Sequence, residues 1–453
     1  MKRNHRTLRA ITCLLLIVML MLPLLSSCVA DTRSISRTEI NESGELIVHY
    51  SDGSSENLGI VKGADGEDGA PGIRGEAGKK GSDGEDGAQG EPGKDGKDGQ
   101  DGIVTIVPES ESIALATSKG LRSAVSIYCD LSNGSYSSAG SGVIWKLDRN
   151  TGDALIITNH HVVYSRYNAA SGYISNNITV LLYGSEYERL GIRAEYVGGS
   201  MNYDIAVLKI TGSELLRNSD AIAITAADSE TVGVGTEAIA IGNPAAMGLS
   251  ASRGIISVDS EHLTMTAADG RTQITLRVMR MDTAVNSGNS GGGLFNHAGE
   301  LIGIVNAKIS SSSIENIAYA IPSNLAIAVA QNIVDHCLGT TTKTVMRATV
   351  GISIGILDSY SAYDTTTGQI KTVEQIAIKA ITENSLSHGK LQAGDVLLSV
   401  TLGEKTVNVT RSHHALDLLL EARAGDTVTF RILRGEEEMT VSITISSENM
   451  VAY

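Results

Sequence analysis

Three short segments of the chain carry the residue types that acyl transfer to a serine requires. Residues 288–292 read GNSGG and place Ser290 among glycines, which let a backbone bend sharply and a substrate approach closely. His161 offers an imidazole and Asp204 offers a carboxylate. A nucleophilic serine needs a base to take its proton, a carboxylate to orient that base, and N–H donors for the oxyanion. The sequence therefore offers a candidate for each role, with the oxyanion hole expected within Gly288, Asn289 and Ser290.

Each segment alone has a more ordinary explanation. A serine among glycines is usually part of a loop, a histidine at a strand end is more often structural, and an aspartate before a strand usually caps a turn. The order His, Asp, Ser across a β-rich segment, however, matches chymotrypsin-type proteases rather than α/β-hydrolases. In that arrangement the base of the substrate pocket lies about six residues before the nucleophile. Here Ala284 and Val285 stand there without an acid, so a small or medium aliphatic P1 residue is expected.

The elements that position these residues are predicted to be mainly strands. The apolar run Leu155–Ile157 precedes the histidines, and Ile205–Leu208 follows Asp204. Many similar Val/Ile-rich runs, broken by Gly, Asn, Asp and Ser, fill residues 114–310 and indicate an all-β barrel or sandwich. A helix is expected from Pro322–Ser323 to Cys337. Because single cores rarely exceed about 250–300 residues, a second domain is also expected, from about Val345.

The N-terminus has the pattern of an export signal. Four basic residues precede the apolar stretch Ile11–Leu25, which is too short for a membrane span of about 20 residues. The following Leu25-Ser26-Ser27-Cys28 resembles the lipobox of bacterial lipoproteins, which implies lipidation of Cys28 and a membrane anchor. Plain cleavage nearby, which leaves a secreted protein, is the alternative.

Glycine occupies every third position from Gly63 to Gly102 without interruption. A triple helix requires this period because only glycine fits the axis where three chains meet. The segment resembles bacterial collagen-like repeats and would demand a trimer, although an acidic disordered linker is the alternative. Before it, residues 44–59 alternate apolar positions around Ser51-Asp52-Gly53, which predicts a β-hairpin.

Composition excludes some functions and leaves one question open. A formal net charge of -15 argues against nucleic-acid binding, because phosphate contacts need a basic face. Of the four cysteines, Cys129 and Cys337 lie outside the leader, and either a disulfide or two buried free thiols is compatible with their positions.

Over roughly Ser118–Ile445 the chain resembles the HtrA (DegP/DegS-like) family of serine proteases. The family pattern T-N-x-H-V is met by residues 158–162, D-x-A-V-L-K-I by 204–210, and the nucleophile block by 282–292. The resemblance implies a chymotrypsin-like double β-barrel with His161, Asp204 and Ser290 as the catalytic triad, and leaves His160 as a bystander. The family often has proline or alanine where this chain has Gly293, which is expected to loosen the turn.

The C-terminal part resembles a PDZ domain, an α+β fold that binds peptide C-termini by β-augmentation. By that resemblance Val350, Gly351 and Ile352 would receive the terminal carboxylate, beside a helix over Ser412–Ala422. The adjacent His413 and His414 have no further ligand at metal-site spacing in the sequence, so neither a metal nor a cofactor is expected. The expected division is a signal peptide over 1–28, a β-hairpin region over 29–62, a collagen-like repeat over 63–102, a linker over 103–117, the protease domain over 118–340 and the PDZ domain over 345–448.

These features predict a serine endopeptidase of the bacterial cell envelope, lipid-anchored or secreted, that cleaves misfolded or damaged exported proteins. Its partners would be unfolded protein substrates, C-terminal peptides at the PDZ domain and two further copies in a homotrimer, since family members of this kind are commonly trimers. Two alternatives are a regulatory protease with one dedicated substrate and a non-catalytic adhesion protein on a collagen-like stalk.

Overall fold

The computed structural model describes residues 35–60 and 109–453, apart from residues 42, 44, 131–134, 186–190, 307–316 and 366–367. The expected signal peptide, Cys28 and the glycine repeat lie outside the described residues. The chain divides into one unit over residues 1–100 and a larger one over residues 101–453. None of the helices within the described residues combines the length and apolar character that a membrane crossing requires.

The described part of the first unit is a small antiparallel sheet of three strands, β1 (Ile35–Ile40), β2 (Glu45–Tyr50) and β3 (Ser55–Ile60). Strands β2 and β3 form a hairpin around Gly53, whose φ of +83° is a left-handed conformation that glycine adopts without strain. The sheet therefore contains the hairpin expected over residues 44–59 and adds β1 as a third strand.

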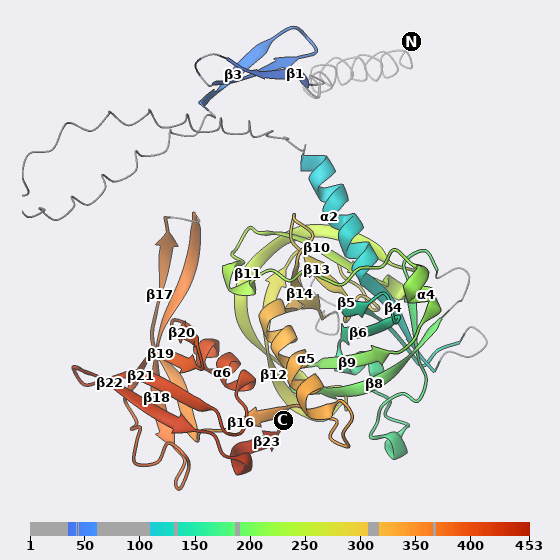
Figure 1. Ribbon diagram of the computed structural model, residues 1–453. Coiled ribbons are helices and arrows are strands. Elements are labelled where there is room, and N and C mark those ends of the chain that lie inside the picture. Colours follow the sequence, from blue (N-terminus) through green and yellow to red (C-terminus); the bar gives the residue numbers. More distant parts are fainter. Residues whose placement is uncertain are drawn as a thin grey trace, which may run out of the picture. The chain divides into compact units, whose positions relative to one another are not determined.

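The larger unit begins with two closed six-stranded barrels (Figure 1). The first follows the order β4-β5-β6-β9-β8-β7 and the second the order β10-β11-β12-β15-β14-β13. This confirms the expected mainly-β, chymotrypsin-like double barrel. The strands of the first barrel are β4 (Ala124–Cys129), β5 (Ser138–Asp148), β6 (Asp153–Thr158), β7 (Ile178–Leu182), β8 (Ile192–Ser200) and β9 (Ile205–Ile210). Those of the second are β10 (Glu237–Gly242), β11 (Ser250–Thr266), β12 (Gln273–Met281), β13 (Gly293–Phe295), β14 (Leu301–Val305) and β15 (Ala318–Pro322).

Strand β9 shows why these apolar runs are continuous rather than alternating. Ala206 and Leu208 face the interior of the first barrel, whereas Ile205 and Val207 join a core shared with the second barrel and α5 (Ser323–Cys337). Both faces are therefore covered, and every position gains free energy by leaving water, at about 25 cal/mol per Å². Helix α5 packs on β8, β9 and β14 and so joins the two barrels.

Helix α2 (Glu109–Ser123) covers most of the segment expected to be a linker over 103–117, and its later turns pack into the core shared by the two barrels. Ala116 is 1% exposed, and a Cβ on Gly120 would lie 2.3 Å from the Ile241 side chain. The helix passes so close to the second barrel there that a larger residue would require the Ile241 side chain to move. The barrel core therefore includes residues before 118, where the expected linker ends.

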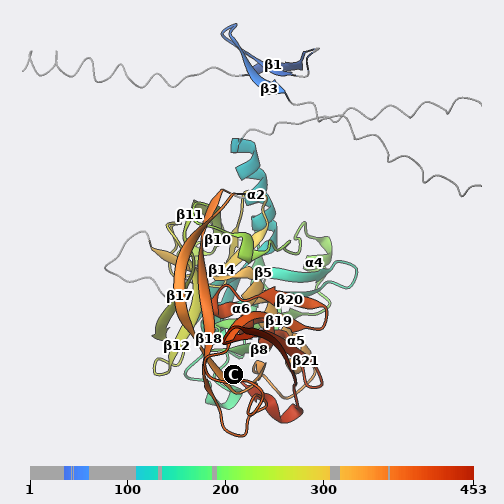
Figure 2. The same ribbon diagram turned by 90° about the vertical axis from the view of Figure 1, so that its left-hand side faces the viewer.

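The C-terminal domain is a mainly antiparallel sheet with one helix, α6 (Ser412–Glu421). Figure 2 shows β17 and β18 as a long hairpin, with β17 at the edge of the sheet. The last strand pairs with β16 and extends the domain past the expected end at residue 448. The strands are β16 (Met346–Ala348), β17 (Ile352–Asp364), β18 (Gln369–Ile381), β19 (Val396–Leu402), β20 (Lys405–Asn408), β21 (Thr427–Arg434), β22 (Glu437–Thr444) and β23 (Met450–Ala452).

The remaining described helices are short. They are α3 (His160–Val163), α4 (Glu214–Asn218), η1 (Ala169–Ser171), η2 (Ser229–Thr231), η3 (Pro244–Ala246) and η5 (Ser447–Asn449). Cys129 and Cys337 are buried free thiols, which settles the alternative that the sequence left open. Burial raises the pKa of Cys129 to about 12 and that of Cys337 to about 11, so both thiols stay protonated and unreactive.

Candidate active site

Strand pairing in the first barrel brings His161 and Asp204 together. Strands β6 and β9 are neighbours, with Thr158 opposite Ala206, so the end of β6 lies beside the start of β9. His161 Nδ1 lies 2.7 Å from Asp204 Oδ2, and the His161 backbone N–H donates to Oδ1 at 2.9 Å. Both carboxylate oxygens thus fix the same histidine, which holds its ring in one orientation.

Asp204 is enclosed by groups that stabilise its charge. Asn306, which follows β14 of the second barrel, donates from Nδ2 to Asp204 Oδ2 at 2.8 Å, and Asn159 donates to the Asp204 carbonyl at 2.9 Å. Burial by itself raises the pKa of Asp204, but the His161 charge and hydrogen bonds outweigh it and lower the pKa. Asp204 has a φ of +50°, a conformation that costs a non-glycine residue about 1–2 kcal/mol.

Ser290 lies in the loop between β12 and β13, and this loop is tied to the first barrel. Ser141 of β5 donates from its backbone N–H to the Ser290 carbonyl at 2.8 Å and from Oγ to the Gly288 carbonyl at 2.7 Å. A Cβ on Gly291 would lie 2.3 Å from Thr158 Oγ1 and 3.0 Å from the Asn159 nitrogen. The loop with Ser290 is therefore packed against the segment that leads to His161.

The three expected oxyanion positions differ in their surroundings. Gly288 has a φ of +101°, and a Cβ there would lie 2.1 Å from the Asn243 carbonyl, so only glycine is compatible with this loop. The Asn289 N–H donates within the loop to the Asn286 carbonyl at 3.0 Å. The Asn289 amide is thus already engaged, in contrast to its expected use in the hole.

The positions expected to line the substrate pocket lie at the edge of the second barrel. Ala284 is exposed and its carbonyl accepts a hydrogen bond from Ser252 Oγ at 2.6 Å, while Val285 is half-buried against the core of that barrel. A cavity of about 590 Å³ beside the Ser290 loop is lined by Asn286, Ser287 and parts of residues 244–250, and neither Ala284 nor Val285 lines it.

Gly293 does not extend the glycine turn. It is the first residue of β13 and pairs with both Ile241 and Ile304. A Cβ there would lie 2.4 Å from the Phe295 ring, so the glycine makes room for the buried phenylalanine. The expectation that Gly293 loosens the turn is therefore not supported by its place in a paired strand.

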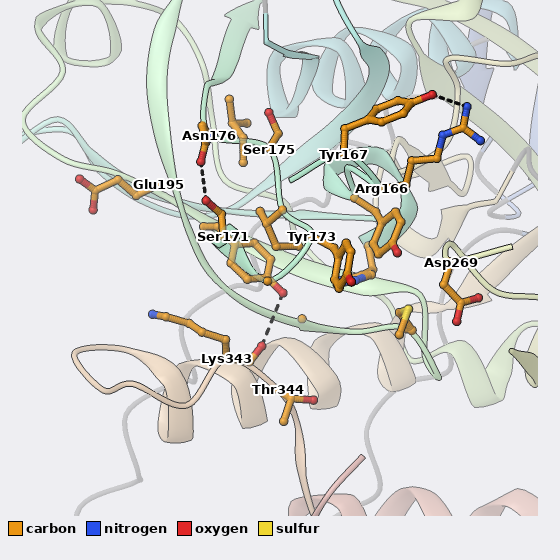
Figure 3. Close-up of a pocket in the computed structure, with 18 of the residues that line it drawn as sticks. Arg166, Tyr167, Ser171, Tyr173, Ser175, Asn176, Glu195, Asp269, Lys343 and Thr344 are labelled. Atoms are coloured by element: carbon orange, nitrogen blue, oxygen red, sulfur yellow. Dashed lines mark hydrogen bonds between the residues drawn. The ribbon is translucent and has the colours of Figure 1, made fainter. Parts of the chain in front are cut away.

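A larger cavity of about 1350 Å³ has His160, but not His161, among its lining residues. Figure 3 shows Tyr167, Tyr173 and Asp269 among the other residues of its wall. Tyr164 and Tyr173 stack there with ring centres 5.9 Å apart. His160 is 7% exposed, and burial lowers its pKa to about 4. Its Nδ1 has no hydrogen-bond partner among the described residues, so this nitrogen makes no hydrogen bond to Asp204.

Sequence reasoning did not find two features of these sites. Asn306 is an asparagine after an apolar strand, a pattern that ordinarily indicates only a turn, and its contact with Asp204 spans 102 positions. Among the described residues, the one group of side chains that could hold a metal lies away from the His161–Asp204 pair, at Glu230, His413 and His414.

The expected peptide-binding segment starts the C-terminal sheet. Val350 is buried, Gly351 has a φ of +78°, and Ile352 is the first residue of edge strand β17. A Cβ on Gly351 would lie 2.1 Å from the Ser385 Cβ. The segment is thus held in one shape by the neighbouring loop, whose Ser387 donates from Oγ to the Val350 carbonyl at 2.6 Å.

Comparison with known proteins gives a consistent picture. A family model described as a trypsin-like peptidase domain matches residues 140–304, and a collagen triple helix repeat model matches residues 58–105. The serine protease Do-like HtrA of Lactococcus lactis subsp. cremoris is 31% identical over 326 residues, which cover 68% of this chain and 71% of the relative.

A probable periplasmic serine protease, do/HhoA-like, of Haemophilus influenzae is 34% identical over 270 residues, with coverage of 59% of this chain and 50% of the relative. Among solved structures, the HtrA-type protease AlgW with a tripeptide matches with a TM-score of 0.49 at 26% identity, over 74% of this chain and 96% of that one.

Proposed function

The chain belongs to the HtrA family of serine proteases and is a serine endopeptidase, and from this premise we propose that His161, Asp204 and Ser290 are its catalytic triad. The observation that carries the proposal is the double contact of Asp204 with His161, at Nδ1 and at the backbone N–H. This contact engages Nδ1, so Nε2 points away from the carboxylate and is the ring nitrogen that takes a proton. Family membership removes the non-catalytic adhesion protein from consideration.

In the proposed reaction His161 Nε2 takes the Ser290 proton while the serine oxygen attacks the peptide carbonyl. The proton then passes to the leaving amine, and a water activated by His161 hydrolyses the acyl-enzyme. Asp204 holds the ring tautomer and stabilises the imidazolium. Its lowered pKa supports this role, because the carboxylate stays ionised while the imidazole gains charge.

We assign the oxyanion hole to the backbone N–H groups of Gly288 and Ser290. The Asn289 N–H is excluded because it donates to Asn286. The left-handed φ of Gly288 supports the assignment, because this conformation changes the direction in which the backbone N–H groups around Gly288 point. For the P1 residue a small or medium aliphatic side chain remains the proposal, on the absence of an acid at Ala284 and Val285.

The C-terminal domain is proposed to bind peptide C-termini as a PDZ domain. Strand β17 is an edge strand, which can accept an added strand, and α6 packs beside it. Val350, Gly351 and Ile352 would present backbone N–H groups to the terminal carboxylate. Peptide binding there would tune the protease, whose α5 packs directly on α6.

The proposed setting is the bacterial cell envelope, with Cys28 as a lipid anchor and the protein as a homotrimer. The lipobox-like leader and the periplasmic relative support the location. The collagen repeat supports three chains, since a triple helix needs three. The proposed substrates are misfolded or damaged exported proteins.

Hydrolysis of reduced casein by the mature protein tests the triad. Ser290→Ala is expected to abolish cleavage, whereas Ser287→Ala, a change of serine in the same loop, is expected to retain it. Equal activity of wild type and Ser290→Ala would overturn the assignment of the nucleophile. A panel of unrelated unfolded proteins then separates the two remaining functions, because a dedicated regulatory protease would leave most of the panel intact.

A further inference from the structure

Three potential metal ligands from distant parts of the chain converge where the protease domain meets the C-terminal domain. His413 and His414 lie in the first turn of α6, and Glu230 lies in η2 of the protease domain. Glu230 Oε2 is 3.2 Å from Nε2 of His413 and 3.2 Å from Nε2 of His414. The ligand atoms of all three residues lie within 4.8 Å of one another.

The two nitrogen–oxygen separations are close to those around a tetrahedral metal ion. With metal–ligand bonds of about 2.0–2.1 Å, tetrahedral geometry places neighbouring ligand atoms about 3.3–3.4 Å apart. The two nitrogen–oxygen distances differ from that value by about 0.1–0.2 Å, so a metal ion needs little movement of the side chains. The histidine rings are nearly perpendicular, at 82°, with centres 4.7 Å apart, so the two nitrogens approach Glu230 from different directions.

Groups around the ligands hold them in place. His414 Nδ1 lies 2.9 Å from the Asn408 carbonyl, and the Thr410 N–H donates to the same nitrogen over a longer distance of 3.3 Å. The shorter contact favours the tautomer with the proton on Nδ1, in which the lone pair of Nε2 faces the Glu230 carboxylate. Two electron-rich atoms at 3.2 Å repel unless a cation or a proton lies between them. Backbone hydrogen bonds of this kind to Nδ1 are typical of histidines that bind metals through Nε2.

The second oxygen of Glu230 is also fixed. Arg277 Nη2 donates to Glu230 Oε1 at 2.6 Å, and Arg277 Nη1 donates to Asp417. Asp417 offsets the guanidinium charge, and the fork of Arg277 leaves Glu230 Oε2 directed at the two histidines. Hard oxygen-seeking ions such as Ca²⁺ and Mg²⁺ do not suit two imidazoles, whereas Zn²⁺ does.

We propose that Glu230, His413 and His414 form a Zn²⁺ site that links the first turn of α6 to the protease domain. Three protein ligands leave a fourth position for water. The site would act as a clamp between the domains, in addition to the bridge that Arg277 makes between Glu230 of η2 and Asp417 of α6. If α6 forms one wall of the peptide groove, as proposed above, the clamp also affects peptide binding, but the metal site itself does not depend on that function.

Metal content of the full mature chain tests the proposal, with Ser290→Ala present throughout to prevent self-cleavage. After loading with Zn²⁺ and dialysis, about one Zn²⁺ per chain is expected. His414→Gln and Glu230→Gln should each weaken Zn²⁺ binding by at least about tenfold, because each removes a ligand. His297→Gln, which changes an exposed histidine outside the cluster, should leave it unchanged.

The visible absorption of bound Co²⁺ distinguishes a metal site from a hydrogen-bonded cluster without a metal. Co²⁺ in place of Zn²⁺ should give the intense visible absorption of a tetrahedral site, lost in His413→Gln, His414→Gln and Glu230→Gln. The weak absorption of an octahedral Co²⁺ ion would overturn the proposal. It would also be overturned if all three variants retained as much Zn²⁺ as the parent. The cluster would then be a hydrogen-bonded contact between the two histidines and Glu230. Neither outcome bears on casein cleavage, so failure here is separate from failure of the triad.

Discussion

At the scale of single residues, the two adjacent histidines of α3 are expected to have different functions. His161→Gln should lower kcat/KM on casein-derived peptides by a factor on the order of 10^6, because it removes the proposed base. His160→Gln should retain activity within about tenfold, since His160 Nδ1 has no hydrogen-bond partner among the described residues and faces Gly199 and Tyr196 instead. Steady-state kinetics on both variants would decide, and the reverse pattern would make His160 the base.

The ionisation of Asp204 also predicts how stability depends on pH. The folded-state pKa of Asp204 is lowered, so its ionised form adds stability above the unfolded pKa of 3.8, and this stability is lost as the pH falls through the folded value. Calorimetry of wild type and Asp204→Asn should therefore show the largest difference in melting temperature near neutral pH. The difference should shrink below about pH 4. A difference that stays constant down to pH 2 would contradict the lowered pKa.

At the scale of the elements, the loop between β12 and β13 depends on Gly288. Gly288→Ala adds a Cβ to a left-handed residue and places it 2.1 Å from the Asn243 carbonyl, so the loop must shift and activity should fall at least about a hundredfold. Gly270→Ala is the matched control, because Gly270 has a φ of +73° but open space around a Cβ. Peptidase assays with circular dichroism as a check on folding would test this. Equal activity of the two variants would show that the clash is absorbed.

The sequence predicts an element well when the residues that determine it lie close together in the chain. Helix α5 was expected over residues 322–337 and is found at Ser323–Cys337, because an apolar period with a proline before it is a local signal. The triad candidates were found because their motifs are short. Helix α2 is not predicted from the sequence, because Gly120 lowers the helix propensity of its segment. The close packing of Gly120 on Ile241 is visible only in the folded structure.

The same argument explains what was missed at the interface between the domains. His413 and Glu230 are 183 positions apart, so no spacing rule connects them. The sequence near the two histidines offers no further ligand at metal-site spacing, and the fold brings Glu230 beside them from a distant part of the chain. Asn306 was missed for the same reason, because it reaches Asp204 from the other barrel.

At the scale of the whole molecule, several polar contacts join the C-terminal domain to the barrels. Arg411 donates to Asp259 at 2.9 Å, Arg423 donates to Asp335 at 2.6 Å, and Asn332 donates to the Leu420 carbonyl at 3.0 Å. On the C-terminal domain these contacts involve Arg411 just before α6, Leu420 in its last turn and Arg423 just after it. The helix that forms one side of the proposed peptide groove is therefore also the helix most directly connected to the protease.

The assembly of whole chains gives the last prediction. The glycine repeat over residues 63–102 contains two prolines, Pro71 and Pro92, so a rod of roughly 120 Å would have little stability alone. If the protease domain sets the stoichiometry, analytical ultracentrifugation should find a trimer both for the mature chain and for a variant lacking residues 63–102. An isolated peptide of those residues should be monomeric. A monomeric deletion variant beside a trimeric mature chain would assign the assembly to the repeat instead, and a monomeric mature chain would exclude both the trimer and the triple helix.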